Sequence, residues 1–491
     1  MQIIPLDGGV GGDEVADIER QPVFVDFNYP HDPRLPLNWP LAKKVYVQVV
    51  LGLFILVGTI TTSIMGPAQR MITAEFQVAD EVAVLNTSLF MVGYIAGFLV
   101  FGPLSEKFGR KWPLITGMGA SSAFSAMPAL GRDTATILAG RFLAGFFGVA
   151  CMAVMGGVAS DCFTLSHRGV AMPVVVAVVF LGPTFGAVVG SAVVALSPSW
   201  RWTSGAVAIA GFVLSAASCV ALPETYPPAI LRSEAARLQM NSGVLEVRSA
   251  LDKEGFTLEH IARVYLIRPF WLLATQPILA LLTLYQAFLH GVLFLFYQSY
   301  PYLFGTIRGW PQQLSALPLL GINAGVLVGT AGIILYNQLY FRHLHHVAAE
   351  VADGAYIPEA RLPPMILGGV LIPVGLFWYA WTSSPEISWA STACASPLIG
   401  CGMYLVFIQG FNYIVDCYTS MANGAMGING SVRCSFAAAF PLFASQMFRE
   451  LGVAYATTAL GAISVCLVPV PVCFWYWGDR IRSWSRRRIV V

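Results

Sequence analysis

Apolar stretches of membrane-spanning length recur along the whole 491-residue chain. A helix needs about 20 mainly apolar residues to cross the hydrocarbon core of a bilayer. Twelve such stretches can be placed, at residues 45–66, 84–103, 112–130, 134–159, 170–196, 203–222, 273–298, 315–336, 364–382, 390–413, 424–447 and 452–476. The chain is 56% hydrophobic and only 11% charged, against roughly 25% charged in soluble domains. We therefore predict an all-α integral membrane protein with twelve transmembrane helices.

The stretches fall into two groups of six that are separated by a polar segment. Residues 45–222 hold the first group, residues 271–477 the second, and residues 223–270 carry the mixed charges of an exposed linker. This linker is expected to be cytosolic, with one or two amphipathic helices and no core of its own. Residues 1–44 are polar and acidic, which predicts a disordered tail, and residues 478–491 form a short basic tail. Two six-helix halves around a long loop predict an internal duplication.

Positive charge is concentrated on one side of the predicted topology. On that side lie 21 of the 28 Lys and Arg residues, and five lie on the other. By the positive-inside rule, both termini are then cytosolic. The remaining two, Arg141 and Arg433, fall within spans. The basic carboxyl-terminal tail favours contact with anionic lipid over a protein partner, and the net charge of +2 is no reason to expect nucleic acid binding. Nine cysteines without a CxxC pair predict neither a metal site nor a disulfide framework.

A short charged run, from Gly102 to Leu114, separates the second and third spans. Its glycines and charged residues are Gly102, Glu106, Lys107, Gly109, Arg110 and Lys111. So short a turn must hold two membrane helices close together at one membrane face, as a gate requires. Glu106 is expected at a helix amino terminus, with Arg110 and Lys111 facing anionic headgroups. Asp161 ends the fourth span on the same side, so an Arg110–Asp161 bridge would latch the gate; the alternative is a basic loop that serves topology alone.

This run and five other motifs, in their order along the chain, resemble the signatures of the major facilitator superfamily. Within that superfamily they resemble the fungal branch of the twelve-span drug:proton antiporters. The resemblance covers about residues 36 to 485. The other motifs are Asn38–Pro40, the fourth-span signature Arg141–Gly148, the fifth-span exporter signature Gly182–Gly190, Pro223–Pro228 and Asn412–Asp416. The counterpart of the charged run in the second half, at Asn337–His343, is a degenerate match.

The resemblance implies an exporter that works by alternating access, with the proton gradient as energy source and no cofactor. It also implies a monomer in the cell membrane, with the plasma membrane favoured, and a part for Arg141 in coupling proton movement to substrate movement. Gly182, Gly186 and Gly190 recur every four residues and lie on one helix face, where small residues allow another helix to approach closely. With Pro183, this face is implied to form a stiff interface at the outer gate of exporters.

Charged and titratable residues within the spans are candidate functional groups because their burial in a membrane is unfavourable. Arg141 and Arg433 are such residues, whereas all 26 Asp and Glu fall in tails, loops or span ends. Two embedded cations without an embedded anion favour an anionic substrate. Many relatives carry a glutamate where Gln298 stands, so a proton-binding carboxylate is absent there, and His290 in the same span is the alternative titratable group.

Polar side chains within the spans are expected to line a central cavity, or else to bond between helices. They are Tyr94, Tyr285, Gln286, Tyr297, Gln298, Asn323, Gln409 and Asn412. The leading prediction is a proton-coupled exporter of a small organic compound, such as a drug, toxin, secondary metabolite or organic acid. An uncoupled facilitator is the nearest alternative, and a non-transporting membrane sensor is less favoured because the tail after the last span and the central linker are short. No nucleophile–base set, phosphate loop or metal cluster indicates an enzyme.

Overall fold

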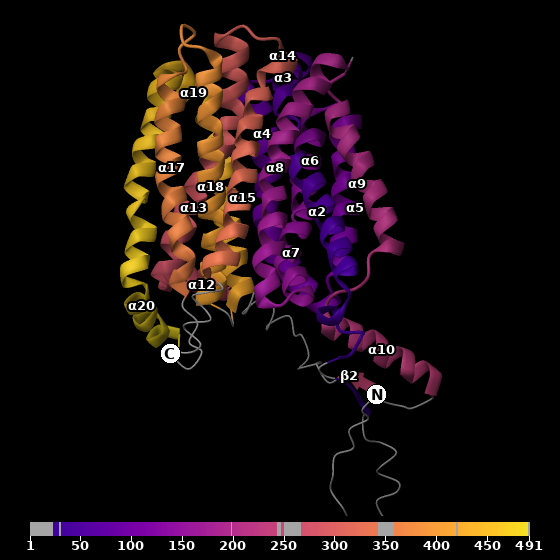
Figure 1. Ribbon diagram of the computed structural model, residues 1–491. Coiled ribbons are helices and arrows are strands. Elements are labelled where there is room, and N and C mark those ends of the chain that lie inside the picture. The colour runs from indigo at the N-terminus through magenta and orange to yellow at the C-terminus, as the bar shows by residue number, and fades with distance from the viewer. Residues whose placement is uncertain are drawn as a thin grey trace, which may run out of the picture.

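Long apolar helices make up nearly all of the structure, a computed structural model. It describes residues 23–28, 31–197, 199–242, 247–249, 267–341, 358–418 and 421–489. The helices run side by side in one bundle (Figure 1). One end of the bundle, here called the linker end, carries α10 (Pro227–Ser242), β2 (Val247–Ser249) and the end of α20, whereas α3 and α14 lie at the opposite end, here called the cavity end.

The first half contains the first six membrane crossings. They are α2 (Leu41–Ser63), α4 (Asp80–Phe108), α5 (Lys111–Leu130), α6 (Thr134–Gly148) continued by α7 (Ala150–Cys162), α8 (Leu165–Leu196) and α9 (Trp202–Ala221). Short helical turns precede α2 at Pro36–Asn38 and follow it at Gly66–Ala68, and α3 (Gln69–Phe76) leads into α4. The predicted second span, 84–103, is extended at both ends, so the turn of the charged run is reduced to Gly109 and Arg110.

The second half contains the other six crossings. They are α13 (Pro277–Tyr300), α15 (Leu320–Tyr336), α17 (Leu362–Trp381), α18 (Trp389–Cys417) and the two parts of α19 (Ala422–Leu467) on either side of Gly452, the second of which α20 (Pro469–Ile489) continues. Shorter elements are α12 (Arg268–Thr275), α14 (Gln312–Ser315) and the turns Pro301–Ile307, Leu317–Leu319, Asn337–Phe341 and Pro358–Arg361. A break at Gln276 and Pro277 separates α12 from α13, where the sequence predicted one span from residue 273.

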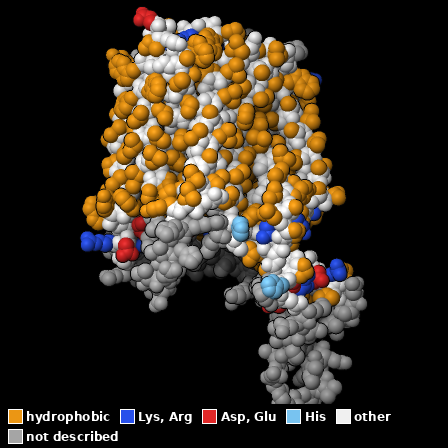
Figure 2. Space-filling view, in the orientation of Figure 1, with side chains coloured by type: hydrophobic (Ala, Val, Ile, Leu, Met, Phe, Trp, Pro, Cys, Tyr) orange, Lys and Arg blue, Asp and Glu red, His pale blue; other side chains and the backbone are white. Residues whose placement is uncertain are grey.

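The prediction of twelve spans is confirmed. Ten helical segments among the described residues are long and apolar enough to cross a membrane. The last of them, Ala422–Ser483, makes two crossings because the backbone reverses at Gly452, whose φ is +75°. The remaining crossing is α5, which is 20 residues long but richer in Gly and Ser. Hydrophobic side chains cover the middle of the bundle and charged ones gather at its ends (Figure 2), as expected of a multi-pass membrane protein.

The two halves meet through a repeated helix pairing. In the first half α4 packs on α6, α5 on α9 and α2 on α8; in the second, α17 packs on α18, α13 on α19 and α15 on α18. Between the halves, α4 packs on α19 and α15 on α8. Each half thus presents its second crossing to the fifth crossing of the other, as an internal duplication predicts.

The described part of the predicted amino-terminal tail packs against the linker. β1 (Val23–Val25) pairs in parallel with β2, and Val25, Phe27 and Leu35 pack against Leu231 and Ala235 of α10. The linker therefore does contribute to a small apolar cluster, because the tail supplies the apolar side chains that α10 alone lacks. Residues 1–22 of the tail and 243–246 and 250–266 of the linker lie outside the described residues.

Charged residues precede the first crossing and follow the last one. Asp32 accepts a hydrogen bond from Arg34 (Nη2–Oδ2, 2.6 Å), and this bond lowers the pKa of the Asp32 carboxyl. It fixes the chain just before α2. At the other end of the sequence, the predicted basic tail, 478–491, continues α20 as a helix to Ile489, although residues 490 and 491 lie outside the described part.

Candidate functional site

A cavity of about 450 Å³ lies between the two halves and reaches the loops at the cavity end. This volume lies within the range of pockets for small organic molecules. The first half contributes side chains from α2, α3, α4 and α8, and the second half contributes them from α13, the turn after it and α19. Four buried polar atoms on this wall have no hydrogen-bond partner among the described residues: Gln69 Nε2, Thr73 Oγ1, Ser191 Oγ and the Tyr297 hydroxyl. A ligand or water can satisfy them.

Three polar contacts join the halves around the mouth of this cavity. Arg449 Nη2 lies 3.4 Å from Asp80 Oδ2, and both side chains are mostly exposed. Arg70 Nη2 donates to Thr306 Oγ1 at 3.0 Å, and Gln312 donates to the Pro67 carbonyl. Exposed contacts of this kind are weak, so the mouth is held lightly.

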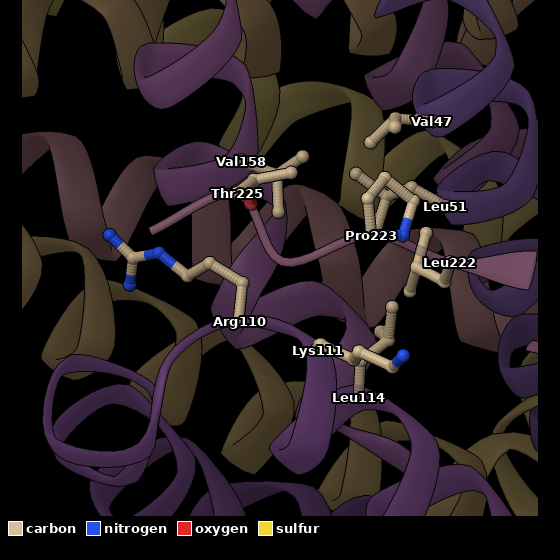
Figure 3. Close-up of a pocket in the computed structure, with 9 residues that line it drawn as sticks. All are labelled: Val47, Leu51, Arg110, Lys111, Leu114, Val158, Leu222, Pro223 and Thr225. Atoms are coloured by element: carbon tan, nitrogen blue, oxygen red, sulfur yellow. The ribbon is translucent and has the colours of Figure 1, made fainter. Parts of the chain in front are cut away.

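The charged run forms a tighter arrangement at the linker end. Arg110 Nε lies 3.0 Å from Asp161 Oδ2, and both side chains are about nine-tenths buried. The pairing expected from the sequence is therefore present. The expectation that Arg110 faces lipid headgroups is wrong, because its guanidinium turns inward to Asp161 and to Ser105 Oγ, 2.9 Å away. Figure 3 shows the Arg110 and Lys111 side chains pointing in opposite directions.

Glu224 completes this arrangement and was not identified from the sequence as a site residue. Its carboxylate accepts hydrogen bonds from the backbone N–H groups of Arg110 (2.8 Å) and Lys111 (3.2 Å). These groups open α5, where backbone donors lack intrahelical partners and negative charge is favourable. The Arg110 guanidinium also lies 4.7 Å from the ring of Tyr226, whose pKa is raised by burial. The motif Pro223–Pro228, which contains both Glu224 and Tyr226, was the sequence signal that could have identified them.

A second ion pair stands at the equivalent place in the other half. Arg361 Nε lies 3.1 Å from Asp416 Oδ2, and both side chains are 9% exposed. The sequence placed the counterpart of the charged run at Asn337–His343, and Arg361 was not identified. The usable signals were Asp416-Cys417, which repeats Asp161-Cys162, and an arginine three residues before a proline at the start of the third crossing of each half. Arg342 and His343 lie outside the described residues.

Each ion pair adjoins a hydrogen bond that crosses between the halves. In the second half, Arg361 donates to Asn337 Oδ1 (3.4 Å), and Asn337 Nδ2 donates to the Gly169 carbonyl of the first half (2.7 Å). In the first half, Glu106 accepts from the side chain of Asn423. Glu106 lies in the last turn of α4, so the helix amino terminus it meets is that of α19, across the interface, and not that of its own turn.

Arg141 is fully buried, and its guanidinium is hydrogen-bonded to backbone carbonyls. Its guanidinium donates to the carbonyls of Thr61 (2.9 Å), Thr62 (3.4 Å) and Asn86 (2.9 Å). Its charge also lies 4.4 Å from the ring of Phe90. The carbonyls of Thr61 and Thr62 belong to the last turn of α2, where backbone acceptors lack intrahelical donors. Arg141 therefore ties three helices together and does not line the cavity.

Arg433 is buried without such bonds. It is 8% exposed, and its guanidinium lies 5.3 Å from the ring centre of Phe407 and 4.7 Å from that of Phe411. Its Nε lacks an acceptor, and Arg433 makes no hydrogen bond or ion pair within the described part of the chain. His290 packs on the same Phe407 ring at 5.8 Å, and its Nδ1 is also without a partner.

Only two of the eight predicted cavity residues, Tyr297 and Gln298, line the cavity. The others lie away from it, Asn412 half-buried and the rest buried, and several bond to neighbouring helices. Tyr94 donates to the Gly58 carbonyl (3.2 Å), and Gln286 pairs with Asn429 (2.9 Å). Asn412 donates to Gln409 within α18. Tyr285 and Asn323 complete the list of residues outside the cavity.

The glycines of the fifth crossing make a close contact with α2. A Cβ built on Gly182 would lie 1.8 Å from Thr59 Oγ1, and one built on Gly190 would lie 2.1 Å from the Ile64 carbonyl. Between them, Ser63 donates to the Pro183 carbonyl. The predicted close helix approach is therefore present, and its partner is the first crossing of the same half.

We expect Gly186→Ala to destabilise the protein by about 1–3 kcal/mol, the usual effect of overpacking a tight contact. Its Cβ would meet Ser63 Oγ at 2.4 Å and the Ile60 carbonyl at 2.5 Å. The matched control is Gly52→Ala in α2, where nothing lies within 4 Å and a better helix former should raise stability by up to about 1 kcal/mol. Thermal unfolding of the purified variants measures both, and equal stability would contradict the close contact.

Comparison with known proteins places these features in a family context. The sequence profile described as Major Facilitator Superfamily matches residues 50–441. The MFS-type transporter oryN of Aspergillus oryzae is 40% identical over 473 residues, which cover 96% of this chain and 91% of that protein. The citrinin biosynthesis cluster MFS transporter mrr1 of Monascus ruber is 38% identical over 98% of both chains. The ascochitine biosynthesis cluster MFS transporter of Didymella fabae is 37% identical over 98% of this chain and 92% of its own.

A solved structure shares the fold. The proton:xylose symporter XylE, bound to 6-bromo-6-deoxy-D-glucose, superposes with a TM-score of 0.62 over 89% of this chain and 96% of its own. The two sequences are 13% identical, so the likeness concerns the arrangement of helices and not the ligand.

Proposed function

Since the chain belongs to the major facilitator superfamily, we propose that it exports a small organic compound from the cytosol in exchange for protons. It is a secondary transporter and not an enzyme. Relatives named for citrinin and ascochitine biosynthesis clusters support a secondary metabolite as the cargo. We propose that it works as a monomer in the plasma membrane.

The observation that carries this proposal is the asymmetry between the two ends of the bundle. The cavity reaches the loops at one end, where the halves touch through exposed contacts. At the linker end, two buried ion pairs adjoin the hydrogen bonds that cross between the halves. This is one state of an alternating-access cycle. In our proposal the linker end is cytosolic, in keeping with its excess of Lys and Arg, and the Arg110–Asp161 and Arg361–Asp416 pairs latch it.

Exchange for protons requires a titratable group at or beside the cavity. Among the described residues that line the cavity, Asp80 is the only carboxylate, and it lies at the mouth. Gln298 lines the wall as an amide, which favours the uncoupled facilitator as the second candidate. His290 is the titratable group beside the cavity wall, since its ring packs on that of Phe294 at 5.3 Å. We propose it as the proton site.

Export measurements separate these candidates. We expect metabolite profiling of culture medium to show one compound or compound class that depends on the chain, and its extracellular accumulation to stop when a protonophore collapses the pH gradient. A facilitator would still equilibrate the compound across the membrane under these conditions. A medium identical with and without the chain would instead support a membrane sensor.

A further inference from the structure

The two arginines buried in the spans are not equivalent. The guanidinium of Arg141 donates hydrogen bonds to three backbone carbonyls. Arg433 is nearly as deeply buried, but within the described part of the chain its charge meets only two aromatic rings. A buried cation that lacks an anion or acceptors is unfavourable, so this arrangement is retained at the expense of stability. An unsatisfied guanidinium of this kind is suited to a ligand that brings the missing acceptors.

Aromatic rings connect Arg433 to the cavity. Phe407, on which its guanidinium lies, also contacts the His290 ring, and His290 contacts Phe294. Phe294 and Tyr297, whose ring centres are 5.3 Å apart, line the cavity. His290 lies in the middle of α13 yet retains exposed surface, which indicates free space around it. Arg433 is therefore linked to the cavity wall through the rings of Phe407, His290 and Phe294 in turn.

Phe407 also meets the other half of the protein. Its ring lies 5.1 Å from that of Phe180 in α8, in an edge-to-face arrangement. When the halves rock apart at the linker end, this contact has to change, and the rings that cover Arg433 change with it. The guanidinium then becomes available from the central space.

We propose that Arg433, Phe407 and Phe411 form a substrate station that selects planar aromatic compounds with one carboxylate or comparably acidic group. The guanidinium matches a carboxylate through two parallel N–H···O bonds, while a flat ring of the substrate packs against the phenylalanine faces. Because Arg433 is a single unpaired cation, the station favours a substrate with a single negative charge. This inference rests on the proposed function, because it names the substrate class for the same transport pathway.

Ligand-induced thermal stabilisation tests the station on the full-length protein in lipid nanodiscs. The probes are 1-naphthoate, which has both ring and charge, 1-naphthamide, which keeps the ring alone, and cyclohexanecarboxylate, which keeps the charge alone. We expect only 1-naphthoate to raise the melting temperature clearly. Arg433→Gln should weaken its apparent affinity by about 30-fold or more, as when one partner of a buried charge pair is removed. Arg132→Gln, the same change at an exposed outer position, should leave the affinity unchanged.

Two further variants keep the test decisive if Arg433→Gln does not fold. Arg433→Lys retains the charge but not the paired donors, and is expected to bind 1-naphthoate more weakly than the parent. Phe411→Leu removes one ring face and should weaken 1-naphthoate binding as well. Without ligand, Arg433→Gln should be at least as stable as the parent, because an unpaired cation has been removed.

Several results would overturn the proposal. Equal stabilisation by 1-naphthamide excludes recognition of the charge, and equal stabilisation by cyclohexanecarboxylate excludes recognition of the ring. Undiminished binding by Arg433→Gln excludes Arg433, and absence of binding by every probe excludes the substrate class. None of these results affects the chain-dependent export described above. If that export fails while 1-naphthoate still binds through Arg433, the proposed function is wrong and the station stands.

Discussion

Arg141→Met is expected to destabilise the protein by about 3 kcal/mol or more and to abolish transport. The substitution removes a guanidinium that bonds to the Thr61 and Asn86 carbonyls at 2.9 Å each and leaves these acceptors buried without donors. Hydrogen bonds to a charged group contribute about 1.5–3 kcal/mol each. The last turn of α2 and the second turn of α4 would lose their shared anchor. Thermal unfolding of the purified protein and efflux from cells measure the two effects.

Two control variants define what Arg141 contributes. Arg141→Lys keeps the charge but offers a compact ammonium that cannot span carbonyls on two helices, so stability should be only partly restored. Arg132→Met removes an exposed arginine from the loop before α6 and should change neither property. If Arg141→Met were as stable as the parent but inactive, the anchor would be wrong, and a role in coupling alone would remain.

Asp161→Asn combined with Asp416→Asn is expected to open the linker end. Each substitution leaves an arginine buried without its charge partner, a change that destabilises the surrounding structure by about 3–5 kcal/mol. Arg361 bonds to Asn337 directly, and Arg110 bonds to Ser105, which directly precedes Glu106, so both cross-half contacts should loosen. We expect the double variant to open much more than either single variant, because one intact latch still holds the halves together.

Two natural thiols report this opening. Cys162 is fully buried and Cys417 is half-buried, and each directly follows the aspartate of its ion pair. In backgrounds that keep only one of them, a membrane-impermeant maleimide should label each thiol at least about tenfold faster in the double variant, a shift of about 1.4 kcal/mol. Asp479→Asn, the same change in an exposed carboxylate at the linker end, serves as the control. Unchanged labelling would mean that the ion pairs only join helices within each half.

The sequence allowed the helix count and the Arg110–Asp161 pair to be predicted, because both depend on local features. Spans follow from apolar length, and the pair follows from opposite charges at two span ends on the same side. Arg361 was not found because the loop before it, partly outside the described residues, no longer resembles its counterpart in the first half. Sequence similarity between the two halves does not locate equivalent residues where only the arrangement of the helices is shared.

The cavity wall was harder to predict than the fold. Tyr94, Gln286 and Tyr297 look alike as polar residues within spans, yet the first two bond to neighbouring helices and only Tyr297 reaches the cavity. The difference lies in which carbonyl or amide of another helix happens to stand opposite, and the sequence of a single span does not contain that information. The same limit applies to Arg141 and Arg433, because both are single arginines within apolar spans and their partners stand on other helices.

The pairing of β1 with β2 sets an order of events during synthesis. Val23–Val25 leaves the ribosome early, but its partner Val247–Ser249 follows α9 and α10 in the chain. The strands can therefore join only after all six helices of the first half have been made. Once joined, they tie the beginning of the chain to the segment that follows the first half, and so close the first half as a unit.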